Sequence, residues 1–340
     1  MVKAVGGGII TGMERIIFTH DYYYIISLEN LLEAWQEFLN SKRKRQDVQE
    51  FERNLMANVI KLHAELANFT YQSSGYQAFN ISDPKPRNIH KASVRDRLLH
   101  HAIYRQLYPF FDNTFTSDSY SCRDSKGTHK AINKFRSMAL KVSQNNTKTV
   151  YILKCDIKKF FANINHTILK NIISQYIKDQ NILWLLNIVI DSFEVSPNTG
   201  LPLGNLTSQL FVNIYMNEFD QYVKHKLKQK YYIRYADDFV FLSTDRNDLL
   251  KLIKPIKDFL GKKLQLTIHP KKISLSTLAS GVDYLGYVHF PKYRVLRTKT
   301  KKRILRLLNQ KNLSSYLGVL KHANTYHLKQ RLLNKIDRMK

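Results

Sequence analysis

The dipeptide Asp237-Asp238 is the feature that most constrains the fold of this 340-residue chain. It lies inside the run YYIRYADDFVFLS, residues 231–243, in which apolar and aromatic residues fill both flanks. That pattern predicts two short strands joined by a tight turn that carries two carboxylates at its tip. Adjacent charges at a tip cost free energy unless water or a cation compensates them, and a divalent metal ion would do so. An ordinary solvated Asp-Asp turn is the alternative interpretation.

A further carboxylate, Asp156, ends a second apolar run, TVYILKCD at residues 149–156. The run predicts a hydrophobic strand, with Asp156 where a strand-to-helix connection begins. A structural cap is one explanation of such a residue, and a functional site is the other. Carboxylates on neighbouring strands can hold two Mg²⁺ ions about 4 Å apart, which serve in-line phosphoryl transfer. Oxygen ligands favour Mg²⁺ over zinc.

The charge balance indicates which phosphates such a site would serve. The chain has 54 Lys and Arg against 27 Asp and Glu, a net charge of +27, and also 18 Phe and 20 Tyr. A charge of this sign and size favours a polyanion such as nucleic acid, tracked along a long groove. Basic runs lie at residues 41–46, 224–230 and 297–306. Each run alone is most often a solvated face, and a ribosome-associated or membrane-surface protein would carry the same balance.

The length of the chain predicts two or three subdomains. The cysteine content and the apolar runs disfavour several classes of protein. The two cysteines, Cys122 and Cys155, are too far apart in sequence for a disulfide framework or a zinc motif, so we expect a reducing cytoplasm. The first 18 residues lack the features of a signal peptide, and the apolar run at residues 181–190 is too short to span a bilayer, so we expect no membrane association.

The periodicity of apolar residues predicts an α+β fold, in which an antiparallel sheet is backed by helices. Such a sheet would bring the end of the Asp156 strand beside the Asp237 turn. From residue 292 onward the chain is basic and is expected to be mainly helical. The predicted helices are 28–40, 48–66, 95–108, 167–178, 207–228 and 247–262. The predicted strands are 149–156, 264–268 and 272–276, with a hairpin at 231–243 and strands with a loop at 71–90. The expected apolar packing stripe is Ile304, Leu305, Leu307 and Leu308.

From about residue 28 to residue 286, the chain resembles the reverse transcriptases of bacterial retroelements. LKCDIKKFF, residues 153–161, matches the metal-binding strand of that family, and YADD, residues 235–238, matches its YxDD turn. The resemblance implies a right-hand polymerase: an N-terminal extension at 1–27, fingers at 28–148, a palm at 149–291 with an insertion at 180–205, and a short helical thumb at 292–340. It also implies two Mg²⁺ ions, with Mn²⁺ as a substitute, held by Asp156, the Ile157 carbonyl and Asp237, with Asp238 in support.

The same resemblance implies roles for further residues. Phe161 would be an aromatic gate against a ribose 2′-hydroxyl, or simply a packing residue. Lys272 would approach the departing pyrophosphate as a general acid, or be one more solvated charge. The residues implied in nucleotide binding are Phe161, Leu203, Gly204, Gln209, Arg87 and Lys272. Those implied in nucleic-acid binding are Arg97, Arg123, Tyr235 and Gly286, the last in a hairpin similar to the primer grip.

One departure from the general family pattern narrows the resemblance. Most reverse transcriptases carry QGxxxSP, whereas residues 201–209 here read LPLGNLTSQ, with Leu203 in place of Gln and Gln209 in place of Pro. This form resembles the enzymes of diversity-generating retroelements. An aliphatic side chain cannot hydrogen-bond, which changes discrimination between nucleotides by about 1–3 kcal/mol. The resemblance thus implies error-prone cDNA, mutated opposite template adenines. Neutral drift in a faithful enzyme is the alternative.

The resemblance also implies partners: template RNA, primer and cDNA, dNTPs, and a small, basic, oligomeric accessory protein. The setting would be a bacterial cytoplasm, with either a chromosome or a phage encoding the element. Two other interpretations stay open. One is a faithful retron-like or group II intron-like reverse transcriptase, and the other is a catalytically silent RNA-binding scaffold.

Overall fold

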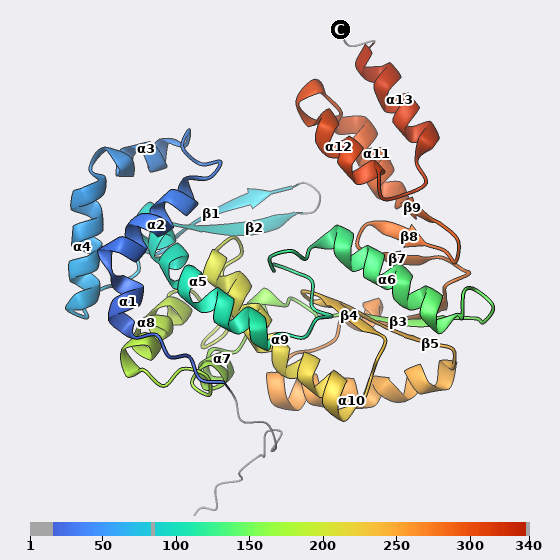
Figure 1. The fold of residues 1–340 in the computed structure, drawn as a ribbon, viewed down its shortest axis with the longest axis horizontal. Helices are drawn as coiled ribbons and strands as arrows, with labels where there is room; N and C mark the ends of the chain where they lie inside the picture. Colours follow the sequence, from blue (N-terminus) through green and yellow to red (C-terminus); the bar gives the residue numbers. More distant parts are fainter. Residues whose placement is uncertain (1–15, 83–85, 338–340) are drawn as a thin grey trace, which may run out of the picture. The chain divides into compact units, whose positions relative to one another are not determined.

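The computed structural model describes residues 16–82 and 86–337 (Figure 1). The chain divides into two compact units. The first unit runs to Thr114 and resumes over Phe161–Tyr215, and the second comprises Phe115–Phe160 and the chain from Met216 onward. The predicted absence of a signal peptide and most of the predicted N-terminal extension concern residues 1–15, which lie outside the described part.

The first unit is mainly helical, with one antiparallel hairpin. In α2, Ser27 accepts a hydrogen bond from the Asn30 amide, and the face that carries Trp35 and Phe38 is fully buried. The hairpin pairs β1 (Tyr76–Ile81) with β2 (Arg87–Ala92). The helices are α1 (Tyr22–Ile26), α2 (Leu28–Leu39), α3 (Gln46–Arg53), α4 (Leu55–Ala67), α5 (Val94–Thr114), α7 (His166–Ile173), α8 (Gln180–Asp191) and the first part of α9 (Leu206–Gln221).

The prediction of one helix over residues 48–66 was wrong, because α3 and α4 are separated at Asn54. This residue has φ −119° and ψ 37°, outside the helical range. Asn competes with the helix for backbone hydrogen bonds, which explains a break that apolar periodicity does not reveal. α7 also ends at Ile173, short of the predicted residue 178, and the helix after it, α8, was not predicted.

The second unit contains a four-stranded antiparallel sheet in the order β4-β5-β3-β6. The strands are β3 (Tyr151–Asp156), β4 (Tyr232–Tyr235), β5 (Asp238–Ser243) and β6 (Ser274–Thr277). This sheet confirms the predicted α+β class. The predicted strand at 264–268 was wrong: α10 (Arg246–Leu264) continues to Leu264, and Gln265 ends it in a left-handed conformation with φ 48°. Beyond that point, Ile268 forms a single bridge to Ile157.

Helices cover both faces of this sheet. Figure 1 shows α6 (Thr128–Val142) and α10 on opposite sides of β3 and β5. Ile152 and Val240 pack in one buried cluster with Phe135 of α6, a helix that the sequence reasoning missed. The intervening side chains face the other way, so that Phe239 meets Phe219 near the end of α9, ring centroids 5.1 Å apart. With both faces buried, the ends of the strands are where polar chemistry can be placed.

A second sheet of β7 (Val282–Tyr284), β8 (Tyr287–His289) and β9 (Arg294–Leu296) precedes the C-terminal helices. The β7–β8 turn is Leu285-Gly286, with φ 50° and 88°, as a tight hairpin turn of the primed type requires. Helices α11 (Thr298–Leu307), α12 (Leu313–Leu320) and α13 (Tyr326–Asp337) share a core with Ile304 and Leu308. Leu305 packs beside this core, but Leu307 is 36% exposed, so its predicted place in the packing stripe was wrong.

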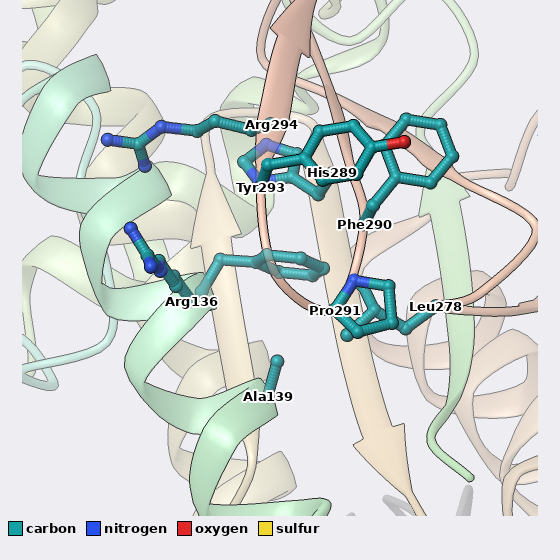
Figure 2. Close-up of a pocket in the computed structure, with 9 residues that line it drawn as sticks. Arg136, Ala139, Leu278, His289, Phe290, Pro291, Tyr293 and Arg294 are labelled. Atoms are coloured by element: carbon teal, nitrogen blue, oxygen red, sulfur yellow. The ribbon is translucent and has the colours of Figure 1, made fainter. Parts of the chain in front are cut away.

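A small cavity lies between α6 and the segment that joins β8 to β9 (Figure 2). The rings of Phe290 and Tyr293 stack beside it at 4.9 Å, and Ala139 lines it from the helix. Its volume of about 10 Å³ is near the minimum for a single water molecule. The cavity is therefore a packing defect of the core and is too small for a substrate.

Acid pH is expected to destabilise the first unit through His100. This α5 side chain is 3% exposed, and burial lowers its pKa from 6.5 to about 4. The unfolded chain takes up the proton below pH 6.5 and the folded chain does not until about pH 4, so stability falls as the pH falls through that window. His100 should contribute about 2–3 kcal/mol to the stability lost between pH 7.5 and pH 4.5, and His100→Leu should reduce the loss measured by urea unfolding by that amount, while His101 and His289, whose pKa values burial also lowers to about 4, keep their own contributions. An equal loss in the variant would contradict the assignment.

Candidate active site

The Asp-Asp dipeptide lies at the turn of the β4–β5 hairpin, as the sequence predicts. Tyr235 pairs with Asp238, so Ala236 and Asp237 form the two-residue loop. Ala236 takes a left-handed conformation with φ 54°, which for a residue with a Cβ costs about 1 kcal/mol. Asp237 is the second residue of this loop, and Asp238 is the first residue of β5.

The end of β3 lies directly beside this turn. Asp156 is the cross-strand partner of Asp238, and the Ile157 amide donates to the Asp237 carbonyl at 3.0 Å. Side chains opposite each other in an antiparallel pair lie on the same face, about 5 Å apart at Cβ. The structure thus brings together the three aspartates from two stretches that are more than 80 residues apart in sequence.

Two lysines are bound to these carboxylates. Lys272 Nζ donates to Asp156 Oδ1 at 2.7 Å, and Lys154 Nζ lies 3.2 Å from Asp238 Oδ2. Lys154 also donates to the Asp283 carbonyl at 2.8 Å, which links Asp238 to β7. The Lys272 side chain is 47% exposed and that of Lys154 is 20% exposed, so Lys272 can move away from its carboxylate more easily than Lys154 can.

The electrostatics of Asp238 indicate that the cluster needs more positive charge than the lysines provide. Burial raises the Asp238 pKa to about 6; Lys154 opposes this shift, and the charges of Asp156 and Asp237 add to it. Its Oδ1 atom is buried and has no hydrogen-bond partner. A buried carboxylate oxygen without a donor is costly unless a cation compensates it.

The donor set fits a hard divalent cation, since it consists of carboxylate oxygens and the backbone beside Asp156. In the described part of the chain, no three His, Cys, Asp or Glu side chains are grouped closely enough to ligate one ion. Asp156 and Asp238 each contact a lysine ammonium instead, at 2.7 Å and 3.2 Å. Ile157, predicted to supply a carbonyl, is buried at 1% exposure next to Asp156.

The residues predicted to bind the nucleotide, apart from Lys272, lie in the first unit. The Phe161 carbonyl accepts a hydrogen bond from the Leu201 amide at 2.8 Å, and the Leu203 carbonyl accepts one from the His90 amide at 3.2 Å. Gly204 has φ 109°, and a Cβ there would come within 3.1 Å of Ile89. Phe161, the LPLG segment and β2 thus form one network. Gln209 lies half-buried on α9, and Arg87 is exposed at the start of β2.

The residues predicted to bind nucleic acid have protein contacts of their own. Arg97 pairs with Asp47, stacks over Phe38 and is 12% exposed. In the second unit, Arg123 Nη1 donates to the carbonyls of Thr116 at 2.7 Å and Ser119 at 3.2 Å. Tyr235 accepts a hydrogen bond from Thr128 at 3.1 Å, and Gly286 forms the β7–β8 turn. These contacts explain each residue structurally, and their roles toward nucleic acid stay predictions.

Sequence reasoning missed two residues that contact the site, Lys154 and Arg234, and a third, Asp220, that binds Arg234. Lys154 lies two positions before Asp156, so strand alternation places both on one face, and this signal was present. Arg234 immediately precedes the YADD motif, but nothing in the local pattern showed that it is buried. Asp220, its partner, lies 14 residues earlier on a helix, and no local signal could have paired the two.

Comparison with known proteins agrees with the site. Residues 81–289, more than half of the chain, match the family described as reverse transcriptase (RNA-dependent DNA polymerase). Protein YkfC of Escherichia coli is 22% identical, over 67% of this chain and 68% of its own length. Group II intron-encoded protein LtrA of Lactococcus lactis is 20% identical, over 84% of this chain and 58% of its own length. The retron Ec73 reverse transcriptase of E. coli is 27% identical, over 53% of this chain and 64% of its own length.

Some relatives are much longer than the matched region: the chain spans 30% of a putative COX1/OXI3 intron 2 protein of Saccharomyces cerevisiae. Within residues 16–82 and 86–337, no helix combines the length and apolarity that crossing a bilayer requires. The family match covers β3, the YADD turn and the short turn Pro270–Lys272, which carry the three aspartates and the two lysines that contact them. The chain therefore belongs to the reverse transcriptase (RNA-dependent DNA polymerase) family.

Proposed function

We propose that this chain is an RNA-directed DNA polymerase whose chemistry takes place at Asp156 and Asp237. The observation that carries the proposal is the pairing of Asp156 with Asp238 directly beside the Asp237 turn. A catalytically silent scaffold would have no need to keep three like charges together at a cost in free energy. The family match supports the same activity.

In this proposal, Asp156, Asp237 and the Ile157 carbonyl hold two Mg²⁺ ions, with Mn²⁺ as a substitute and Asp238 in support. Bound there, such ions would supply positive charge that lowers the pKa of the primer 3′-hydroxyl and stabilises the leaving oxygen. The 3′-hydroxyl loses its proton to water as its oxygen forms a bond to the dNTP α-phosphorus, and the bond from that phosphorus to the bridging oxygen breaks. Lys272, 47% exposed, leaves Asp156 and gives a proton to the departing pyrophosphate.

Nucleotide selection is assigned to the first unit. Phe161 excludes a ribose 2′-hydroxyl, while Arg87 contacts the triphosphate or the template, and Gly204 allows close approach to the backbone. Leu203 and Gln209 are the residues that set fidelity. The support is local geometry: the hydrogen bonds at Phe161 and Leu203 fix their backbones in one network with β2.

We assign the enzyme to a diversity-generating retroelement, in which it makes adenine-mutagenised cDNA from a template-repeat RNA for mutagenic retrohoming. The LPLGNLTSQ form of the motif supports this assignment. The second candidate is a faithful retron-like or group II intron-like enzyme. It is favoured by the similarity to LtrA and to the retron Ec73 reverse transcriptase.

The partners proposed are template RNA, the primer with its cDNA, dNTPs and a small basic accessory protein, in a bacterial cytoplasm. Charge supports the nucleic-acid partners, since residues 292–336 contain 13 Lys and Arg and no Asp or Glu. We assign this basic segment to the thumb, residues 149–291 to the palm and residues 28–148 to the fingers, with Arg97, Arg123, Tyr235 and Gly286 toward primer and template.

Sequencing the cDNA tests the assignment. The purified chain would copy a defined RNA of mixed composition with Mg²⁺ and a DNA primer, with and without the accessory protein encoded beside its gene. We expect substitutions concentrated opposite template adenines. Extension with uniform accuracy at all four template bases would replace the diversity-generating assignment by the faithful one. Absence of Mg²⁺-dependent extension under both conditions would contradict the polymerase itself.

A further inference from the structure

A buried ion pair lies beneath the Asp237 turn, between Arg234 of β4 and Asp220 near the end of α9. Arg234 Nη2 lies 2.6 Å from Asp220 Oδ2, and Nε donates to Oδ1 at 2.8 Å, so the contact is bidentate. The two side chains are 1% and 0% exposed. Buried pairs of this kind are often replaceable by apolar residues without loss of stability, because desolvation offsets the attraction. Stability alone is therefore a weak reason for this pair.

The remaining nitrogen of the guanidinium reaches the turn itself. Arg234 Nη1 donates to the Ala236 carbonyl at 3.2 Å, and Nη2 also donates to Ser119 Oγ at 3.0 Å. The backbone of Arg234 is also held in place, because its amide donates to the Asp118 carbonyl at 3.0 Å and its carbonyl accepts from the Tyr120 amide at 3.0 Å. The bidentate contact with Asp220 fixes the plane of the guanidinium, and this fixes the direction in which Nη1 points.

Ala236 is the residue in this turn whose conformation needs support. Its φ of 54° lies in the left-handed region, and its peptide carbonyl leads directly into Asp237. The neighbouring contacts secure the residues on either side, since Thr128 donates to Tyr235 Oη and the Ile157 amide donates to the Asp237 carbonyl. Arg234 secures the peptide between them. A rotation of that peptide would redirect the Asp237 side chain.

We propose that Arg234 is a positioning residue: clamped by Asp220, it holds the Ala236 carbonyl and so keeps the Asp237 carboxylate in the direction that metal binding requires. This inference rests on the proposed function, because it concerns the same site. On this inference, the Asp220–Arg234 pair orients the turn that carries Asp237 and does not serve mainly to stabilise the fold. Its loss should therefore lower kcat more than it lowers the melting temperature.

Three variants separate geometry from stability. Arg234→Lys keeps the opposite charges but replaces the planar guanidinium by one flexible ammonium, which cannot fix the direction of a donor toward Ala236 through a bidentate contact with Asp220. The double variant Asp220→Leu with Arg234→Met removes both charges and keeps an apolar core. Tyr232→Phe is the matched control, since Tyr232 donates to Asp220 Oδ1 at 2.7 Å and does not contact the turn. Thermal unfolding identifies which variants are folded.

The readouts are kcat and KM for dNTP in primer extension and, separately, Mn²⁺ affinity by electron paramagnetic resonance. We expect Arg234→Lys and the double variant to lose about 10- to 100-fold in kcat with little change in KM, since misplacement by about 1 Å costs this much. Mn²⁺ affinity should fall several-fold in both, and Tyr232→Phe should keep both values. The double variant should keep its low kcat even where its melting temperature equals that of the wild type.

Wild-type kcat and Mn²⁺ affinity in the folded double variant would overturn the proposal, because the turn would then hold its geometry without Arg234. If Arg234→Lys does not fold, the double variant decides alone. Asp237→Asn is measured in parallel: if it retains full extension, the proposed function has failed, whereas an inactive Asp237→Asn beside a fully active double variant refutes the role of Arg234 alone.

Discussion

Replacing Asp237 by Asn should reduce primer extension by about 10³-fold or more while leaving the fold intact, because the change removes a charge that the reaction needs and no packing atoms. The side chain keeps its shape at the tip of the turn. The change also removes one negative charge from a cluster in which Asp156 and Asp237 both raise the pKa of Asp238. The melting temperature should therefore stay equal or rise. Single-turnover extension on an RNA template with saturating dNTP measures the effect.

A matched control for this variant is Asp248→Asn. Asp248 lies at the start of α10, is 61% exposed and pairs with Lys251, and its loss should change extension by less than twofold, since exposed pairs contribute little. Full activity in Asp237→Asn would remove the metal-binding role of the turn. Equal losses in both variants would indicate a general charge effect and not a site.

Leu203→Gln should lower misincorporation opposite template adenine by about 5- to 150-fold, since restoring a hydrogen-bonding side chain adds about 1–3 kcal/mol of discrimination. The exchange is expected to leave the backbone in place. The Leu203 carbonyl is held by the His90 amide, and neither atom belongs to the side chain. The measurement is the frequency of substitutions at each template base in sequenced cDNA.

Leu203→Met is the control for this prediction, because it keeps an apolar side chain of similar volume and adds no hydrogen-bond donor. Its error spectrum should match that of the wild type. If Leu203→Gln and Leu203→Met have the same spectrum, Leu203 does not set fidelity, and the assignment to a diversity-generating element loses its main support.

The sequence predicted the β4-β5-β3-β6 sheet well because three of its strands have strong local signals. The YADD hairpin has apolar residues on both flanks of a two-residue turn, and residues 149–156 are a continuous apolar run that ends in Asp156. Buried strands in the centre of a sheet require such runs. The adjacency of Asp156 to the turn then followed from the expected antiparallel order, which the structure confirms.

Other parts were not predictable from local patterns. The break at Asn54 and the continuation of α10 through Leu264 depend on single residues at helix ends, where periodicity gives little information. The ion pairs of the site depend on residues far apart in the chain: Lys154 meets Asp238, and Lys272 meets Asp156 across 116 positions. Such pairs become visible only when strand register is known.

The strand order β4-β5-β3-β6 has a consequence for how the enzyme would lose activity as it is warmed. β3 and β5 are the interior strands and are hydrogen-bonded on both sides, whereas β4 and β6 are edges. Local opening begins at sheet margins and surface helices, so amide exchange should be slowest in the two ribbons that bear Asp156 and Asp238. The edge strands would then open before Asp156 and Asp238 separate, and enzyme inactivated by mild heating would regain activity on cooling without having to re-form the pairing of β3 with β5.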